Sequence, residues 1–140
     1  MTKFLFSLLV ICLTGCTWSG EHFHYHRQVT VWGLGYTDTK LSAGTWAINY
    51  RGHYITTTQA RDIALLRAAY LCSSDGYPWF MITTQNSDQG RVYGQVGIRV
   101  PYPESTMIVR GLKSRVRGAL NCALLQSTLI QKYPIPILYK

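Results

Sequence analysis

The feature that most constrains the fold is a long helical segment, residues 59–72, with strand-like segments on both sides of it in the sequence. Thr56, Thr57 and Thr58 precede it, and a threonine hydroxyl can accept a hydrogen bond from a first-turn amide that would otherwise have no partner. Gly76 follows it and suits the left-handed exit of a helix. A helix in this place can cover a sheet formed by the strands before and after it.

Two strands are expected before this helix, because β-branched and aromatic residues are concentrated there. Residues 29–36 form the first strand, a polar connection follows at 37–44, and residues 45–51 form the second. This arrangement predicts an antiparallel hairpin. Alternation in the second strand places three large side chains on one face: Trp46, Ile48 and Tyr50.

Three more strands are expected after the helix. The first spans residues 77–85, and a turn at 86–90 leads to the second. The second and third strands span residues 91–100 and 105–110. Between them, Pro101 and Pro103 either interrupt the pairing or lie at an edge of the sheet, because proline has no N–H.

A second helix is expected from about residue 117 to Lys132, where Pro134 and Pro136 stop it. The predicted order is therefore β-β-α-β-β-β-α. This order indicates the α+β class, as a two-layer domain with an antiparallel sheet of about five strands and two helices. A chain of 140 residues has room for one such domain.

The first fifteen residues are expected to lie outside the domain. Lys3 precedes an apolar run of about ten residues, which fits a secretory signal and falls short of the ~20 residues of a membrane span. The four residues that follow, Leu13-Thr14-Gly15-Cys16, resemble the bacterial lipobox. Residues 1–15 are therefore interpreted as a lipoprotein signal peptide.

In a lipobox the cysteine thiol receives a diacylglycerol and the signal is cut just before it, so lipidation is expected at Cys16. The other explanation is a structural cysteine that happens to follow a signal peptide. Thr17 stands where an aspartate commonly retains such proteins in the inner membrane. We expect residues 16–28 to form a lipidated tether on the outer membrane and residues 29–140 to form one periplasmic domain, with the covalent lipid in place of any cofactor.

Three histidines alternate in the tether: His22, His24 and His26. Alternate side chains of an extended segment point the same way, so these imidazoles could face one metal ion. Only Glu21 accompanies them as a further ligand type, and lipidation removes the thiolate of Cys16. No metal site is expected, and a weak histidine site is the alternative.

The chain is strongly basic, with 14 Lys and Arg against 6 Asp and Glu and a formal net charge of +8. Loss of Lys3 with the signal lowers this charge to +7. A periplasmic domain has no access to nucleic acid, so the excess favours anionic lipid, peptidoglycan or an acidic protein face. The densest run is either a solvated surface or a binding site for such partners, and it contains Arg110, Lys113, Arg115 and Arg117.

One charge falls on the predicted sheet-facing side of the first helix. Arg67 lies between Ile63 and Leu71 on the helical wheel. A guanidinium buried without a partner would be costly, and Asp38 on the hairpin is the expected one. An ion pair that fixes helix to sheet is the favoured role of Arg67, and a ligand-binding arginine is the alternative.

The opposite side of this helix is also apolar, at Leu65, Ala68, Ala69 and Cys72. A surface helix normally has one apolar stripe, so something is expected to cover the second. The second helix or the C-terminal tail is the favoured cover, and a partner protein is the alternative. Cys72 and Cys122 are the cysteines left after processing, and they either form one disulfide or stay as buried thiols.

Four short motifs resemble a family of small bacterial envelope lipoproteins of unassigned activity. They are Gly35-Tyr36-Thr37-Asp38, Tyr50-Arg51-Gly52-His53, Leu65-Leu66-Arg67-Ala68-Ala69-Tyr70-Leu71 and Gly76-Tyr77-Pro78-Trp79-Phe80. His53 and Tyr70 depart from the Asn and Glu that are usual in that family. The resemblance implies a lipid-anchored periplasmic domain and assigns no catalytic residues.

No enzyme is expected. The sequence lacks a Gly-x-Ser-x-Gly elbow, a His-Glu-x-x-His motif, a phosphate loop and a Cys-x-x-Cys motif, and His53 is the domain's one histidine. The sequence favours a structural or accessory subunit of a cell-envelope assembly, such as a secretion-system core complex, that contacts envelope proteins. The alternative is a periplasmic binding lipoprotein that recognises a cell-wall or lipid ligand through Arg67, Tyr36 and Tyr50.

Overall fold

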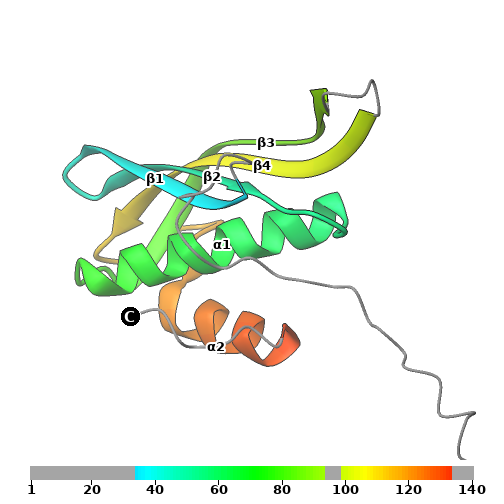
Figure 1. Ribbon diagram of the computed structural model, residues 1–140. Coiled ribbons are helices and arrows are strands. Elements are labelled where there is room, and N and C mark those ends of the chain that lie inside the picture. The colour runs from blue at the N-terminus through cyan, green and yellow to red at the C-terminus, as the bar shows by residue number, and fades with distance from the viewer. Residues whose placement is uncertain (1–33, 94–98, 134–140) are drawn as a thin grey trace, which may run out of the picture.

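The computed structural model describes residues 34–93 and 99–133, with the side chains of these residues except 89–101. It contains one antiparallel sheet of five strands, in the order β1-β2-β4-β3-β5, and two helices (Figure 1). The predicted α+β class and order of elements are confirmed. The elements are β1 (Gly35–Ser42), β2 (Thr45–Arg51), α1 (Thr57–Ser74), β3 (Trp79–Tyr93), β4 (Arg99–Leu112), β5 (Leu120–Asn121) and α2 (Cys122–Lys132).

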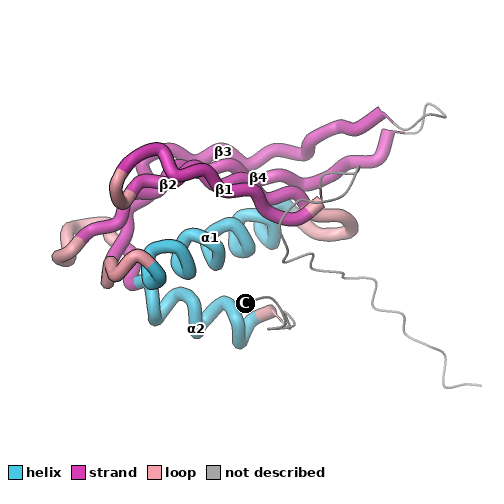
Figure 2. The backbone as a smooth tube through the Cα atoms, turned by 60° about the vertical axis from the view of Figure 1, so that its left-hand side comes forward, coloured by secondary structure: helices cyan, strands magenta, loops and turns pink. Residues whose placement is uncertain are grey.

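α1 lies between the sheet and α2 (Figures 1 and 2). One side of the helix packs on β2, β3 and β4, where the predicted row of Trp46, Ile48 and Tyr50 is buried. α2 contacts the other side, so the second apolar side of α1 is covered from within the chain, as expected. Small side chains let both layers approach the helix closely, and the fully buried ones are Ala60, Ala64, Ala68 and Ala69.

α1 begins at the predicted cap. Thr56 Oγ1 accepts a hydrogen bond from the Gln59 N–H at 3.1 Å, and Gln59 Oε1 accepts one from the Thr56 N–H at 2.7 Å. This reciprocal pair satisfies two amides and fixes the start of the helix. At the other end Gly76 has the left-handed backbone expected of it, with φ of 75°.

β1 lies later in the sequence than predicted. It begins at Gly35 and includes most of the expected connection, because these residues pair with β2 up to Ser42. The turn shrinks to residues 43 and 44, and Gly44 takes a positive φ of 71° there. Residues 29–33 of the predicted first strand lie outside the described residues.

The turn predicted at residues 86–90 is wrong. β3 continues through this stretch because each of its residues stands opposite a residue of β4. A continuous backbone ladder holds polar side chains in a strand that local composition alone would end. The predicted strands 91–100 and 105–110 are accordingly not two strands, because β4 takes in residues of both.

The third strand after α1 is instead β5, two residues that pair with Trp79 and Phe80 of β3. α2 starts later than the expected residue 117, at Cys122, because the Asn121 side chain accepts a hydrogen bond from the Leu124 N–H at 2.8 Å. Its predicted end at Lys132 is confirmed.

Pro101 and Pro103 lie inside β4 at a free edge, which is one of the two predicted alternatives. β2 ends opposite Glu104, so the residues of β4 before it pair only with β3. The Gly52 N–H donates to the Pro103 carbonyl oxygen at 3.0 Å, which means that the Pro103 backbone faces the β2 side. The N–H that each proline lacks would therefore point to the side where β2 has ended, so no hydrogen bond between strands is lost. Beyond this point β3 and β4 extend as a two-stranded ribbon (Figure 1).

Candidate interaction surfaces

β3 has an edge without a partner strand. β5 pairs only with Trp79 and Phe80, and no other strand of the described residues lies on that side of β3. We name residues 81–93 of β3 the open edge. This stretch contains no proline, so every residue in it has an N–H, whereas the free edge of β4 carries two prolines. An unpaired strand edge is a template for another strand.

Hydrogen bonds to β4 fix the direction of its backbone groups. The Gly111 N–H donates to the Gly44 carbonyl oxygen at 2.7 Å, on the same side as the bond between Gly52 and Pro103. The odd-numbered residues of β4 therefore face β2 with their N–H and C=O groups. Because these groups alternate in an antiparallel sheet, the even-numbered residues face β3.

The outward groups of β3 follow from this alternation. Gln85 stands opposite Met107 and Ser87 stands opposite Ser105, both of which are odd-numbered. The N–H and C=O groups of Gln85 and Ser87 consequently point away from β4, toward the open edge. Asn86, opposite the even-numbered Thr106, points its backbone groups toward β4.

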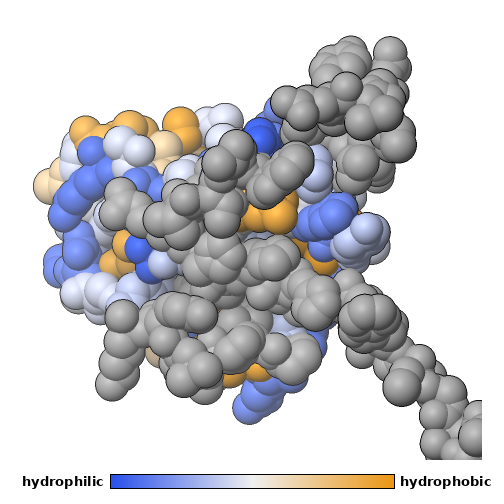
Figure 3. All heavy atoms as spheres, in the orientation of Figure 1, coloured by the Kyte–Doolittle hydropathy of each residue, from blue (hydrophilic) through white to orange (hydrophobic). Residues whose placement is uncertain are grey.

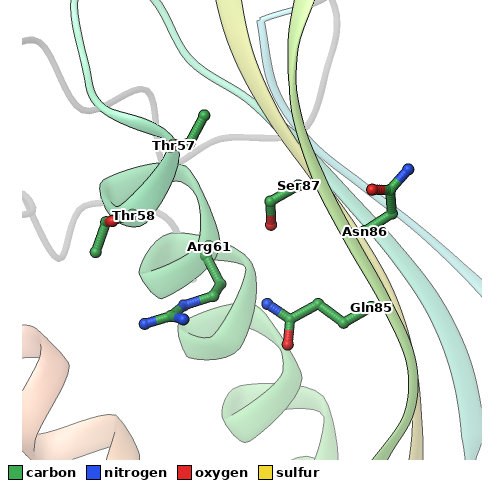
Figure 4. Close-up of a pocket in the computed structure, with 6 residues that line it drawn as sticks. All are labelled: Thr57, Thr58, Arg61, Gln85, Asn86 and Ser87. Atoms are coloured by element: carbon green, nitrogen blue, oxygen red, sulfur yellow. The ribbon is translucent and has the colours of Figure 1, made fainter.

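A cleft of about 420 Å³ separates this part of β3 from the first turns of α1 (Figure 4). Gln85 and Ser87 point toward the helix, and Asn86 points to the opposite side of the sheet. Ser87 Oγ lies 3.1 Å from Ser105 Oγ, which anchors the floor of the cleft. The helix contributes three further residues to the lining: Thr57, Thr58 and Arg61.

The second surface is the predicted basic run at the other end of the sheet. All four of its cations are exposed, and none forms an ion pair within the part of the chain that the structure describes. Lys40, near the end of β1, joins them, although its Nζ lies 2.7 Å from Asp75 Oδ2. We name this surface the basic end, and it comprises Lys40, Arg110, Lys113, Arg115 and Arg117.

Tyr77 holds the basic end together. Its side chain lies against Gly44 and Gly111, where an added Cβ would come within 2.7 Å of the Tyr77 hydroxyl oxygen and within 2.6 Å of a ring carbon, respectively. Lys113 Nζ lies 4.3 Å from the centre of this ring and donates to the Gly76 carbonyl oxygen at 3.0 Å. A second cation, Arg115, lies 5.5 Å from the centre of the Trp79 ring. Aromatic faces thus position both cations without neutralising them.

Two apolar side chains are exposed beside these cations. Leu41 follows Lys40 and is 54% exposed, and Val116 follows Arg115 and is 40% exposed. Figures 1 and 2 place the β1–β2 turn and the end of β4 at the same end of the molecule. Figure 3 shows hydrophilic and hydrophobic residues side by side there, on the left.

The structure joins Arg67 and Asp38, the pair expected between helix and sheet. Arg67 Nε and one terminal nitrogen each lie 2.9 Å from Asp38 Oδ1. The guanidinium also lies over two aromatic rings, 4.2 Å from the centre of the Tyr36 ring and 5.2 Å from that of the Tyr70 ring. Tyr50 is fully buried. Arg67 is thus engaged within the fold, and Tyr50 cannot reach a ligand on the surface.

Cys72 and Cys122 are both buried and free, with no disulfide between them. Cys72 Sγ donates to the Trp79 carbonyl oxygen at 3.2 Å. Burial is the main reason why the pKa of the Cys72 thiol is raised far above its ordinary value, and burial also raises the pKa of Cys122. These thiols are poor nucleophiles.

A buried carboxylate links α1 to the end of α2, and the sequence analysis did not predict this contact. Asp62 Oδ2 accepts hydrogen bonds from Lys132 Nζ and Tyr133 Oη, each at 2.7 Å. The bond to Asp62 is the main cause of the raised pKa of Lys132, and burial is the main cause for Tyr133. The sequence signal that could have indicated this contact is an acidic residue, Asp62, within an apolar helical segment, because a buried carboxylate needs a partner.

Cys16 and the three tether histidines lie outside the described residues. Within the residues that are described, no group of His, Cys, Asp and Glu could hold a metal ion, and no helix is long and apolar enough to cross a membrane. No family model, no curated protein and no solved structure matches this chain.

Proposed function

We propose that the chain is an outer-membrane-anchored lipoprotein that serves as a structural or accessory subunit of a cell-envelope assembly, such as a secretion-system core complex. In this proposal it joins its partner by accepting an extended strand along the open edge. The single observation that carries the proposal is the open edge itself, next to the cleft in front of α1.

Strand addition is a common way for a sheet to bind a peptide, because backbone groups give affinity and alternate side chains give specificity. Gln85 and Ser87 offer outward backbone groups at a spacing of two residues, which is the repeat of a pairing strand. An added strand would direct every second side chain toward the cleft beside Thr58 and Arg61. The polar lining fits a partner segment with hydrogen-bonding or acidic side chains.

The alternative of a ligand-binding lipoprotein has less support. It depended on Arg67, Tyr36 and Tyr50, and of these Arg67 is paired with Asp38 and Tyr50 is fully buried. A partner that recognises backbone groups also needs no catalytic residues, in agreement with the motifs that the sequence lacks.

Site-specific photocrosslinking in intact cells tests the proposal. A photoreactive residue at Thr58 should capture one envelope protein that also copurifies with the chain in detergent, whereas one at the exposed Thr106, on the other face of the sheet, should not. The decisive variant is Gln85→Pro, which removes an outward N–H. It should abolish the crosslink from Thr58, while Asn86→Ala should preserve it.

A crosslink that survives Gln85→Pro would contradict strand addition. Capture of peptidoglycan and of no protein from Thr58 would overturn the assembly role in favour of a binding lipoprotein. Thermal unfolding of each variant separates these results from a loss of folding.

A further inference from the structure

We propose that the basic end docks on an anionic phospholipid surface, the membrane that carries the lipid anchor. This inference rests on the anchor included in the proposed function and not on the strand addition. Docking would hold the domain in one orientation on the membrane, with the β3–β4 ribbon pointing away from it (Figure 1).

The charge pattern fits a phosphate-rich surface. Arg110, Lys113, Arg115 and Arg117 form no ion pair within the described residues, so they are available to headgroups. A cation close to an anionic membrane contributes about 1 kcal/mol, which is a factor of about five in the docking equilibrium. Three such cations together give on the order of 100-fold.

The apolar side chains favour a membrane over an acidic protein face. Leu41 lies near the end of β1, beside the β1–β2 turn, and Val116 lies in the loop after β4, and each follows a cation of the basic end in the sequence. Exposed apolar side chains at this end can enter the headgroup region while the neighbouring Lys and Arg bind phosphate. Tyr77 and Trp79 lie under the cations, and these ring types are enriched at membrane interfaces.

The tether is long enough for this orientation. Eighteen residues separate Cys16 from Gly35, and at full extension they span about 60 Å. β1 runs from Gly35 to the basic end over eight residues, a distance of about 25 Å. The anchor can therefore lie in the same membrane surface that the basic end contacts.

Hydrogen exchange on the lipidated, processed protein in vesicles tests the inference. We compare vesicles of phosphatidylcholine alone with vesicles that also contain phosphatidylglycerol. Backbone amides of residues 41–44 and 113–118 should exchange more slowly in the anionic vesicles only. High salt should remove this protection, because the Debye length falls to about 3 Å at 1 M.

A matched pair of variants separates a local surface from net charge. The first is Lys113→Gln/Arg115→Gln/Arg117→Gln, which should weaken docking by on the order of 100-fold. The second variant, Ala123→Glu/Ser127→Glu/Gln131→Glu, lowers the net charge by the same amount but at exposed positions of α2. This second variant should keep most of the protection, and thermal unfolding should show that both variants fold.

Equal protection in neutral and anionic vesicles would overturn the inference, as would equal loss in the two variants. Flotation of the protein with vesicles measures membrane attachment through the lipid anchor, separately from docking of the basic end. Protein that floats with both vesicle types but shows no protection has the anchor without docking. Protein that floats with neither contradicts the anchor and the docking together, whereas the crosslink from Thr58 tests the strand addition independently.

Discussion

The basic end and the open edge lie in different parts of one sheet and leave opposite kinds of groups unsatisfied. At the basic end the strand backbone is paired, as in the bond between Gly111 and Gly44, whereas four of the five cations form no ion pair within the described residues and only Lys40 is paired, with Asp75. Along the open edge the backbone has no partner strand among the described residues, and two strands away Arg51 is paired with Glu104 at 3.0 Å.

This difference indicates two kinds of contact. Charges act over several ångströms and tolerate many arrangements of an anionic surface, so a cluster of cations suits a fluid membrane. Backbone hydrogen bonds need a defined register within about 3 Å, so an open strand edge suits one specific polypeptide. A domain with both can sit on a membrane and receive a protein partner at the same time.

The largest expected effect is the difference in stability between proline substitutions at two neighbouring positions of β3. Asn86→Pro should destabilise the domain by about 2–4 kcal/mol, because it removes a ladder N–H that faces β4 and strains the pairing. Gln85→Pro should cost less than about 1 kcal/mol, because its N–H faces the open edge. Chemical denaturation of both variants measures the two losses of unfolding free energy. Equal losses would mean that the backbone N–H of Gln85 does not face the open edge.

A smaller effect is expected at the basic end. Gly111→Ala places a Cβ 2.6 Å from the Tyr77 ring and should cost about 1–3 kcal/mol through overpacking. Gly76→Ala is the control, since a Cβ there meets nothing within 4 Å and only its φ of 75° is unfavourable. A double-mutant cycle with Tyr77→Ala should show coupling, and additive costs would exclude Tyr77 as the support of this end.

The smallest effect concerns neither surface but the contact between α1 and α2. Cys72, Lys132 and Tyr133 have raised pKa values, so the folded protein keeps their protons to higher pH than the unfolded chain does. Their stabilisation is present below the ordinary values and is lost as pH rises, first above 9.0 for the thiol and then above 10.5 for the lysine.

The melting temperature should therefore fall by a few degrees between neutral pH and pH 10.5, which circular dichroism can follow. Cys72→Ala/Cys122→Ala should reduce the part of this fall that begins near 9.0. A melting temperature that does not change with alkaline pH would contradict the raised pKa values.

Much of the fold was predictable because its signals are local. The Thr56 cap, the helix after it and the row of Trp46, Ile48 and Tyr50 follow from patterns a few residues long. The pair of Arg67 and Asp38 was also predictable, because a charge on a helix face that packs on a sheet requires a partner.

The boundaries of β1, β3 and β4 were less predictable, since polar residues at 37–42 and 86–90 look like connections. Strand pairing overrides local composition when a neighbouring strand supplies a hydrogen bond for each backbone group. The link from Asp62 to Lys132 and Tyr133 was missed for a related reason, because it joins residues about seventy positions apart in the chain.

The sequence by itself determined the order of the elements, the α+β class and the density of basic residues between 110 and 117, because local propensity and charge are properties of short segments. It also carries the lipobox resemblance at Cys16. Only the tertiary structure decided that β4 lies between β2 and β3, and therefore which edge stays open. It also decided that Lys40 and the run from Arg110 share one end, because such neighbours depend on contacts between segments far apart in the chain.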